Sequence, residues 1–163
     1  MPNIFKVQGF GALSEWNGQF SSASADQAFQ AMASLGSNSI ALTTRIWTDS
    51  RTGNDVLAVP DKTESDASLL AGFQKAHAAG LDVVFKPGIT GLDGTISHSL
   101  APSDVDAFFA SYKAEIVHLA ERLGRSAPVN ATLVALVHAA EQGGRRRWSG
   151  HELLAAVEQA AQK

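Results

Sequence analysis

Apolar residues along the chain follow two alternating periods. Short runs rich in β-branched residues predict strands, and longer stretches with apolar residues three and four positions apart predict helices. Strands are predicted over residues 4–13, 38–47 and 81–89. Helices are predicted over residues 24–36 and 65–80, and from Ser103 along an apolar stripe that ends at Leu123. The run 81–89 is too continuously apolar for a half-exposed strand, so we expect it to be buried.

Local signals mark the ends of the first two helices. Ser24 and Ser65 stand at N-cap positions, where a serine side chain accepts a hydrogen bond from a free backbone N–H. Gly36 and Gly80 follow the last apolar positions, where glycine commonly ends a helix. Acidic residues at helix starts are interpreted as favouring the helix dipole rather than as catalytic groups: Asp61, Glu64, Asp66, Asp104 and Asp106.

Three strand–helix units in succession predict an α/β fold with a parallel sheet and right-handed crossovers. Long loops follow the strands and short ones precede them, as in α/β barrels. The predicted fold is a partial (β/α) barrel of three parallel strand–helix units followed by two C-terminal helices, over residues 126–142 and 149–161. Residues 1–123 are predicted to form the TIM-barrel-like part, and residues 124–163 a helical segment in which Ser149 and Glu152 have capping-box spacing.

Composition narrows the classes of function. The chain has 163 residues, 45% of them hydrophobic, and a formal charge of -3, which argues against nucleic acid or an anionic membrane as the partner. The basic run at residues 145–147 is interpreted as a solvated loop. There is no cysteine, which excludes disulfides and thiolate chemistry. We expect no membrane span and see no signal peptide. The sequence as written is that of a cytoplasmic chain, but its localisation is left unknown, because a removed leader would leave no trace.

Residues 4–121 resemble the amino-terminal part of glycoside-hydrolase-like TIM barrels, a group that includes endo-mannanase-type and arabinogalactanase-type glycosidases. The text that carries the resemblance is "GFGALSEWNGQFSSASADQAFQAMASLGSNSIALTTRIW", "TESDASLLAGFQKAHAAGLDVVFKPGI", "LDGT" and "SDVDAFFASYKAEIVHLAE". The shared features are a glycine and an aromatic residue in the first strand and a Lys-Pro pair that closes the third.

The resemblance implies a carbohydrate partner and a set of substrate-binding residues: Trp16, Arg45, Trp47, Lys86 and Asp93. Tryptophan would stack on sugar rings, and arginine or lysine would bind hydroxyl groups. The alternative interpretation is that the tryptophans pack, the cations are solvated or paired, and Asp93 is structural. Relatives often carry a histidine and an acidic residue after the Lys-Pro pair, whereas this chain reads "KPGIT".

Residues 117–157 are similar to the C-terminal helical segment of ketopantoate reductases, on the wording "LAERLGRSAPVNATLVALVHAAE". The four residues "HLAE" at positions 118–121 fit both families, which suggests a chimera joined there. A working reductase also needs a glycine-rich dinucleotide turn. "GFG" at positions 9–11 lacks the third glycine, so no cofactor is expected.

No catalytic residue is assigned. Glycosidases of the first type need two carboxylates across the scissile bond, and the resemblance implies that these follow the fourth and later strands, beyond the third strand of this chain. The expected function is a truncated, catalytically inactive barrel with at best weak carbohydrate binding. The alternatives are a ketopantoate-reductase-related fragment and a non-enzymatic interaction module. The histidines show no metal-ligand spacing, and no metal is expected: His77, His98, His118, His138 and His151.

The third predicted strand has an unpaired outer edge, which must be protected. One solution is that the C-terminal helices fold back over the sheet through Leu133, Val137, Leu153 and Val157. The other is that copies of the chain associate as a homo-oligomer through the exposed edge.

Overall fold

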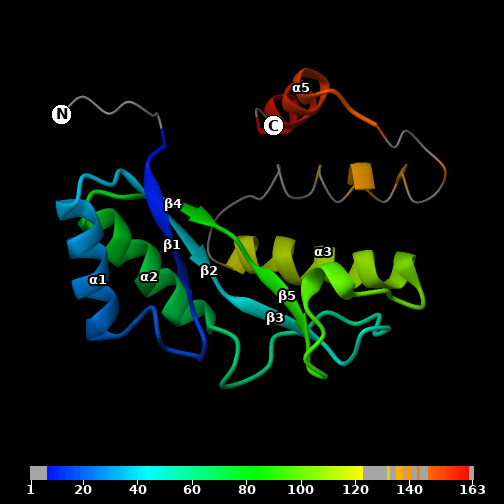
Figure 1. Cartoon of the computed structure of the whole chain (residues 1–163), viewed down its shortest axis with the longest axis horizontal. Helices are drawn as coiled ribbons and strands as arrows, with labels where there is room; N and C mark the ends of the chain where they lie inside the picture. The colour runs from blue at the N-terminus through cyan, green and yellow to red at the C-terminus, as the bar shows by residue number, and fades with distance from the viewer. Residues whose placement is uncertain are drawn as a thin grey trace. The chain divides into compact units, whose positions relative to one another are not determined.

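A computed structural model describes residues 7–122, 132, 135–137, 139, 140, 143 and 147–161 of the chain (Figure 1). Two compact units are present. The first unit comprises Met1–Trp47 with Ala58–Thr90, and the second unit comprises Thr48–Leu57 with Gly91–Lys163. The predicted domain boundary between residues 123 and 124 lies outside the described residues and stays a prediction.

The first unit is built on a three-stranded parallel sheet. Its strands are β1 (Gly9–Leu13), β2 (Ser39–Thr43) and β4 (Asp82–Phe85), in the order β1-β2-β4. In register, Ile40 lies opposite Phe10 on one side and Val83 on the other. The described residues contain no closed barrel, and the predicted partial (β/α) barrel is confirmed.

The second and third predicted strands are each interrupted once. Thr44 separates β2 from β3 (Arg45–Thr48), and Lys86 with Pro87 separates β4 from β5 (Gly88–Gly91), which pairs with β3. The register is kept across both breaks, because Lys86 N–H donates to Leu42 O and Gly88 N–H donates to Thr44 O, each at 2.9 Å. Pro87 has no N–H to donate, which accounts for the break in the third strand.

Two helices lie beside the three-stranded sheet (Figure 1). These are α1 (Ala23–Ser34) and α2 (Asp66–Ala78). Ser65 caps α2 as predicted, but the cap of α1 is Ser22, whose side chain accepts from Ala25 N–H, so the prediction of Ser24 was wrong. Two serines within three residues offer the same local signal, and Ser24 instead hydrogen-bonds to Ser22 Oγ at 2.8 Å. Gly36 and Gly80 have φ of 89° and 79°, which confirms both as helix stops.

The sheet has one covered face and one open face. Ile40 and Leu42 are buried on the covered face, where the ring of Phe73 in α2 meets Phe85 edge-on with centroids 5.8 Å apart. Side chains alternate along a strand, so Val84 points the opposite way. Val84 is 52% exposed, and the expectation that residues 81–89 form a fully buried strand was therefore wrong.

The second unit centres on α3 (Val105–Arg122). Its predicted stripe is confirmed in part, since Phe108, Ile116 and Leu119 are buried, while Leu123 lies outside the described residues. Asp104 Oδ1 accepts from Ala107 N–H at 3.0 Å and so caps the helix. The loops 48–57 and 91–103 also belong to this unit and include a short 3-10 turn, η1 (Ser97–Ser99).

The last described helix is α5 (Gly150–Ala161), and its predicted capping box is confirmed. Ser149 N–H donates to Glu152 Oε2 at 2.9 Å, and Glu152 N–H donates to Ser149 Oγ at 3.3 Å. Most of the predicted helix 126–142, including Leu133, lies outside the described residues. Val137 is 42% exposed and Leu153 36% exposed, so packing of the tail on the sheet stays a prediction.

Candidate functional site

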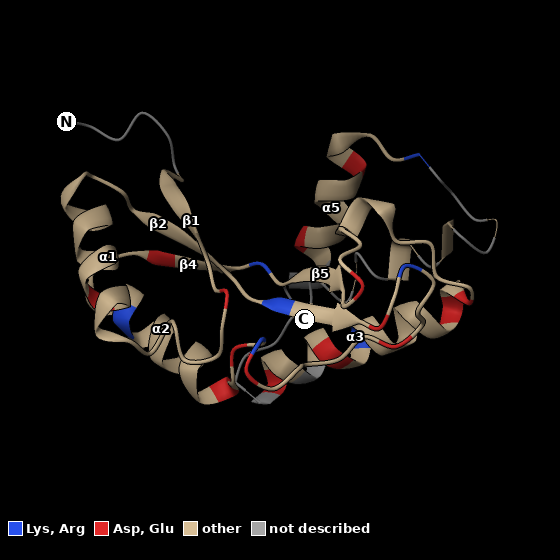
Figure 2. Cartoon of the chain, turned by 60° about the horizontal axis from the view of Figure 1, so that its bottom comes forward, with Lys and Arg blue, Asp and Glu red and all other residues tan. Residues whose placement is uncertain are grey.

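The predicted sugar-binding residues fall into both units. Trp16, Arg45, Trp47 and Lys86 belong to the first unit, whereas Asp93 belongs to the second. The four in the first unit lie in or after strands β1, β3 and β4, toward the carboxyl ends of the parallel strands. This is the edge where α/β folds bind ligands. Figure 2 shows Lys and Arg positions and Asp and Glu positions scattered along the described ribbon.

Arg45 forms an ion pair beside Trp16. Its guanidinium Nη2 lies 3.1 Å from Glu15 Oε1, and the two side chains are 32% and 52% exposed. Trp16, which follows Glu15 in the sequence, is 56% exposed. Glu15, Trp16 and Arg45 therefore form a half-exposed polar and aromatic group, although the ion pair occupies part of the hydrogen-bonding capacity of Arg45.

Trp47 points to the same side of β3 as Arg45, because residues two apart in a strand share a face. The Lys62 ammonium lies 5.1 Å from the centroid of the Trp47 ring, in a cation–π contact. Trp47 Nε1 is buried and has no hydrogen-bond acceptor among the described residues. One face of the ring is thus taken by Lys62, while the indole N–H has no acceptor in the part of the chain that the structure describes.

Lys86 is exposed at the end of β4. Its backbone N–H continues the sheet ladder to Leu42 O, and within the described residues its ammonium forms no ion pair. The following Pro87 fixes the backbone at the break in the strand. As far as the described residues go, Lys86 is therefore an unpaired cation at the strand end, as a hydroxyl-binding residue would be.

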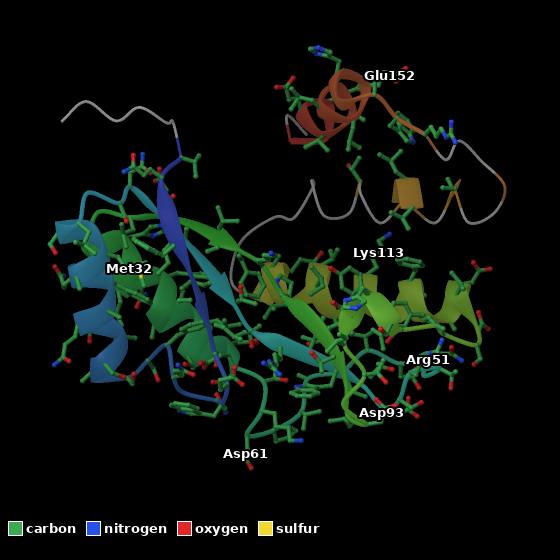
Figure 3. The ribbon with its side chains drawn as sticks, in the orientation of Figure 1. Met32, Arg51, Asp61, Asp93, Lys113 and Glu152 are labelled. Atoms are coloured by element: carbon green, nitrogen blue, oxygen red, sulfur yellow. The ribbon has the colours of Figure 1, made fainter. Side chains whose placement is uncertain are left out.

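Asp93 has a structural role in the turn that follows β5. Figure 3 labels Asp93 and its hydrogen-bond partner Arg51. Its carboxylate accepts Thr95 N–H on Oδ1 and Arg51 N–H on Oδ2, each at 2.9 Å. The hydrogen bonds from the Thr95 backbone, the Arg51 backbone and the Thr95 side chain hold the pKa of Asp93 below its ordinary value of 3.8. These contacts agree with the alternative interpretation of Asp93, and a sugar contact at this residue stays a prediction.

Glu64 is a buried carboxyl group that sequence reasoning placed at a helix start. It is 3% exposed and accepts Gly18 N–H at 2.8 Å and Phe20 N–H at 3.0 Å. The Ser14 hydroxyl lies 2.7 Å from Glu64 Oε1 and 2.8 Å from Trp16 O, so its single proton serves one of these acceptors at a time. Glu64 thus holds the loop that carries Glu15 and Trp16. Its partners lie 44 to 50 residues away in sequence, and no local pattern reveals them.

The described residues hold neither a metal-binding cluster nor a membrane-spanning helix. The described residues include no group of three or more His, Asp or Glu side chains arranged to hold a metal ion. The side chains of His118 and His138 lie outside this set. No helix in the described part of the chain is both long and apolar enough to span a membrane.

Comparison with known proteins gives a consistent family. Residues 9–159 match Glycoside Hydrolase Family 113. A solved GH113 β-1,4-mannanase is similar with a TM-score of 0.66 and 16% identity, over 94% of this chain and 52% of that one. The GH113 β-mannanase AaManA from Alicyclobacillus acidocaldarius, in complex with ManMIm, gives a TM-score of 0.63 and 25% identity over 73% of this chain and 41% of that one.

A further GH113 β-1,4-mannanase complex has a TM-score of 0.61 and 16% identity, and the match covers 72% of this chain and 42% of that one. The chain spans about half the length, or less, of these solved structures. No curated protein matches it.

Proposed function

Because the chain belongs to Glycoside Hydrolase Family 113, we propose that its first unit carries sugar-contacting side chains and binds β-1,4-mannan-type oligosaccharides weakly. The observation that carries this proposal is that Arg45 and Trp47 share one side of β3, while the exposed Trp16 lies next to the Glu15 partner of Arg45. Exposed aromatic rings beside cations are the usual means of binding sugars. The choice of mannan follows the names of the similar solved enzymes.

We also propose that these 163 residues do not hydrolyse glycosidic bonds by themselves. Hydrolysis requires one carboxyl group to protonate the leaving oxygen and a second to act as nucleophile or base. The three carboxyl groups described above are all engaged. Glu15 pairs with Arg45, Glu64 is enclosed by the loop from Ser14 to Phe20, and Asp93 accepts two backbone N–H groups.

Binding and hydrolysis can be tested separately. Tryptophan fluorescence titrated with mannohexaose should give a dissociation constant on the order of 1 mM or weaker. Trp16→Ala and Trp47→Phe should weaken binding, and Trp148→Phe, which changes a tryptophan of the second unit, is the matched control. Equal affinity in all three variants would reject the assignment, and reducing ends released from mannan by the unmodified chain would reject inactivity.

Lys62→Ala adds a sharper test of Trp47. If the sugar stacks on the ring face that Lys62 now covers, removing the ammonium should strengthen mannohexaose binding. If Trp47 only packs against its neighbours, this substitution should leave the affinity unchanged.

The ketopantoate reductase resemblance of residues 117–157 has no support from these comparisons, since the family match runs through the same residues to position 159. NADPH titration tests the resemblance directly. We expect no binding, and a saturable fluorescence change would revive the interpretation of the tail as part of a chimera.

A second candidate function, pairing with another copy of the chain, is favoured by the open face of the sheet. Leu13 is 42% exposed and Val84 52% exposed, and β1 and β4 are the edge strands of the described sheet. Exposed apolar edge strands favour association. Sedimentation velocity should show mass increasing with concentration, and the double variant Leu13→Lys with Val84→Lys should abolish the increase. A concentration-independent monomer would reject this function.

A further inference from the structure

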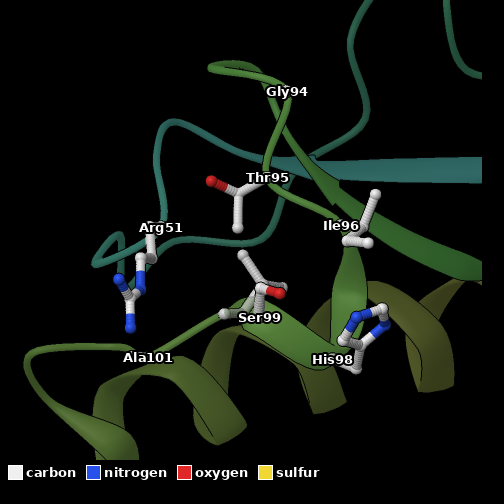
Figure 4. A pocket seen from close by; sticks show the side chains of 8 residues that line it. Arg51, Gly94, Thr95, Ile96, His98, Ser99 and Ala101 are labelled. Carbon is white, nitrogen blue, oxygen red and sulfur yellow. The ribbon is translucent and has the colours of Figure 1, made fainter.

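An open pocket of about 630 Å³ lies in the second unit between the loops that follow β3 and β5. Figure 4 shows Arg51 on one side of it and His98 on the other, with Thr95 and Ser99 between them. This volume lies within the usual range for small-molecule sites, roughly 300–1,000 Å³. None of the sugar-binding residues proposed in the first unit lines the pocket.

Hydrogen bonds between the two loops fix the walls of the pocket. Leu92 N–H donates to Thr48 O at 2.8 Å, and Ser103 N–H donates to Thr52 O at 3.0 Å. The Asn54 side-chain amide adds a bond of 2.9 Å to Ser103 Oγ. A site held in this way needs little ordering when a ligand binds, which lowers the entropy cost of binding.

The backbone of Arg51 is fixed on both sides, but its guanidinium is free. Arg51 N–H donates to Asp93 Oδ2 at 2.9 Å, and Arg51 O accepts Ala101 N–H at 2.8 Å. Among the described residues the guanidinium has no ion pair and no aromatic contact. The Asp93 carboxylate lies close by, yet it binds backbone N–H groups and does not neutralise Arg51. A guanidinium that has no ion pair among the described residues is suited to a carboxylate, which it can bind with two parallel hydrogen bonds.

The rest of the lining selects among anions. The Ser99 hydroxyl can donate to a ligand oxygen, whereas the Thr95 hydroxyl hydrogen-bonds to Asp93 and can still accept from a ligand hydroxyl. Ile96 and Leu100 offer apolar surface for the C–H face of a sugar ring. Arg51 is the only permanently charged residue of the lining. The Asp93 carboxylate accepts Arg51 N–H and so places a negative charge nearby, which disfavours a dianion such as phosphate more than a single carboxylate.

We infer that the Arg51 pocket binds a saccharide unit carrying a single carboxylate, with the guanidinium on the carboxylate, the Ser99 hydroxyl donating to a sugar oxygen and the Thr95 hydroxyl accepting from a sugar hydroxyl. The site is independent of the mannan-binding residues proposed in the first unit. Mannan is neutral and has no carboxylate for Arg51 to bind. Glucuronate binding at Arg51 and mannan binding in the first unit can therefore be measured, and can fail, separately.

The test uses D-glucuronate as the probe, with D-glucose, acetate and inorganic phosphate as comparison ligands. Amide chemical shifts of Thr95 and Ser99 should move saturably with glucuronate and little with the other three. Arg51→Ala should weaken glucuronate binding by roughly ten-fold or more. Arg51→Lys keeps the charge but loses the planar fork, and should also bind more weakly than the unmodified chain.

Lys113→Ala is the matched control. It removes an exposed positive charge from α3 in the same unit, away from the pocket lining, and should change the affinity by less than about two-fold. Unchanged amide spectra elsewhere in Arg51→Ala would show that the loops are still folded. The inference is overturned if glucuronate leaves Thr95 and Ser99 unmoved, if Arg51→Ala binds normally, or if acetate or phosphate binds as tightly as glucuronate.

Discussion

Replacing Glu64 by alanine should release the loop that carries Glu15 and Trp16. In the folded chain, Gly18 N–H and Phe20 N–H both donate to the Glu64 carboxyl group, at 2.8 and 3.0 Å. A buried donor left without an acceptor costs about 1–3 kcal/mol. The bond from Phe20 is buried, whereas that from Gly18 is only part-buried and water can replace it. Ser14 keeps Trp16 O as a second acceptor at 2.8 Å.

We therefore expect Glu64→Ala to lower the free energy of unfolding of the first unit by about 1–3 kcal/mol, because the Phe20 N–H is the buried donor that loses its acceptor. This is a large fraction of the roughly 5–15 kcal/mol that typically separates folded from unfolded domains. Glu64→Gln should have an intermediate effect, because its amide keeps one acceptor oxygen but turns a donor toward the other backbone N–H.

Urea denaturation followed by circular dichroism gives the overall loss, and hydrogen exchange of the Phe20 amide gives the local one. Glu15→Gln is the control, since it breaks an exposed ion pair that contributes about 0–1 kcal/mol. If Glu64→Ala costs no more than Glu15→Gln, or if the Phe20 amide keeps its protection, Glu64 does not hold the loop and the reasoning fails.

Three further predictions concern other parts of the molecule. Tyr112 is the only tyrosine in the chain, and burial raises its pKa above 10.0, so a near-ultraviolet titration should show ionisation at a higher pH in the folded chain than in urea. The free energy of unfolding should therefore fall as pH rises above about 10, and equal titration midpoints in the two states would refute this. Because the pKa of Asp93 is depressed in the folded state, the contribution of its carboxylate to stability is complete above about pH 4 and is lost as pH falls through the folded-state pKa. The chemical shift of the Thr95 amide should follow this loss and should not change with pH in Asp93→Asn. Gly72→Ala should destabilise the first unit by about 1–3 kcal/mol in thermal unfolding, since the added Cβ would lie 2.8 Å from Phe20 Cβ. A gain in stability would instead show that the higher helix propensity of alanine outweighs the crowding.

The sequence predicted those parts of the fold that depend on neighbouring residues. The stops at Gly36 and Gly80, the cap at Ser65 and the capping box of Ser149 with Glu152 are decided within a few positions, and all are present. The parallel order of strands also followed, because alternating strands and helices leave few other arrangements.

Sequence patterns did not predict those features of the fold that distant contacts decide. Val84 lies in an apolar run, but whether a strand is buried on one face or two depends on what covers the sheet, which a single run does not encode. Glu64 precedes a capping serine and resembles a helix-start acid, yet its hydrogen-bond partners lie in the loop after β1. Long-range partners of this kind become visible only in the folded chain.

Arg45 and Arg51 show why candidate binding residues are harder to identify than strands. Arg45 lies in the second predicted strand and Arg51 in the loop after it, and the family resemblance pointed only to Arg45. In the folded chain Arg45 is paired with Glu15 at 3.1 Å, whereas the Arg51 guanidinium has no partner among the described residues. A ligand must break an existing ion pair to gain the full hydrogen-bonding capacity of Arg45, but it meets no such competition at Arg51. The residue that resemblance missed is therefore the better placed of the two to bind an anionic ligand.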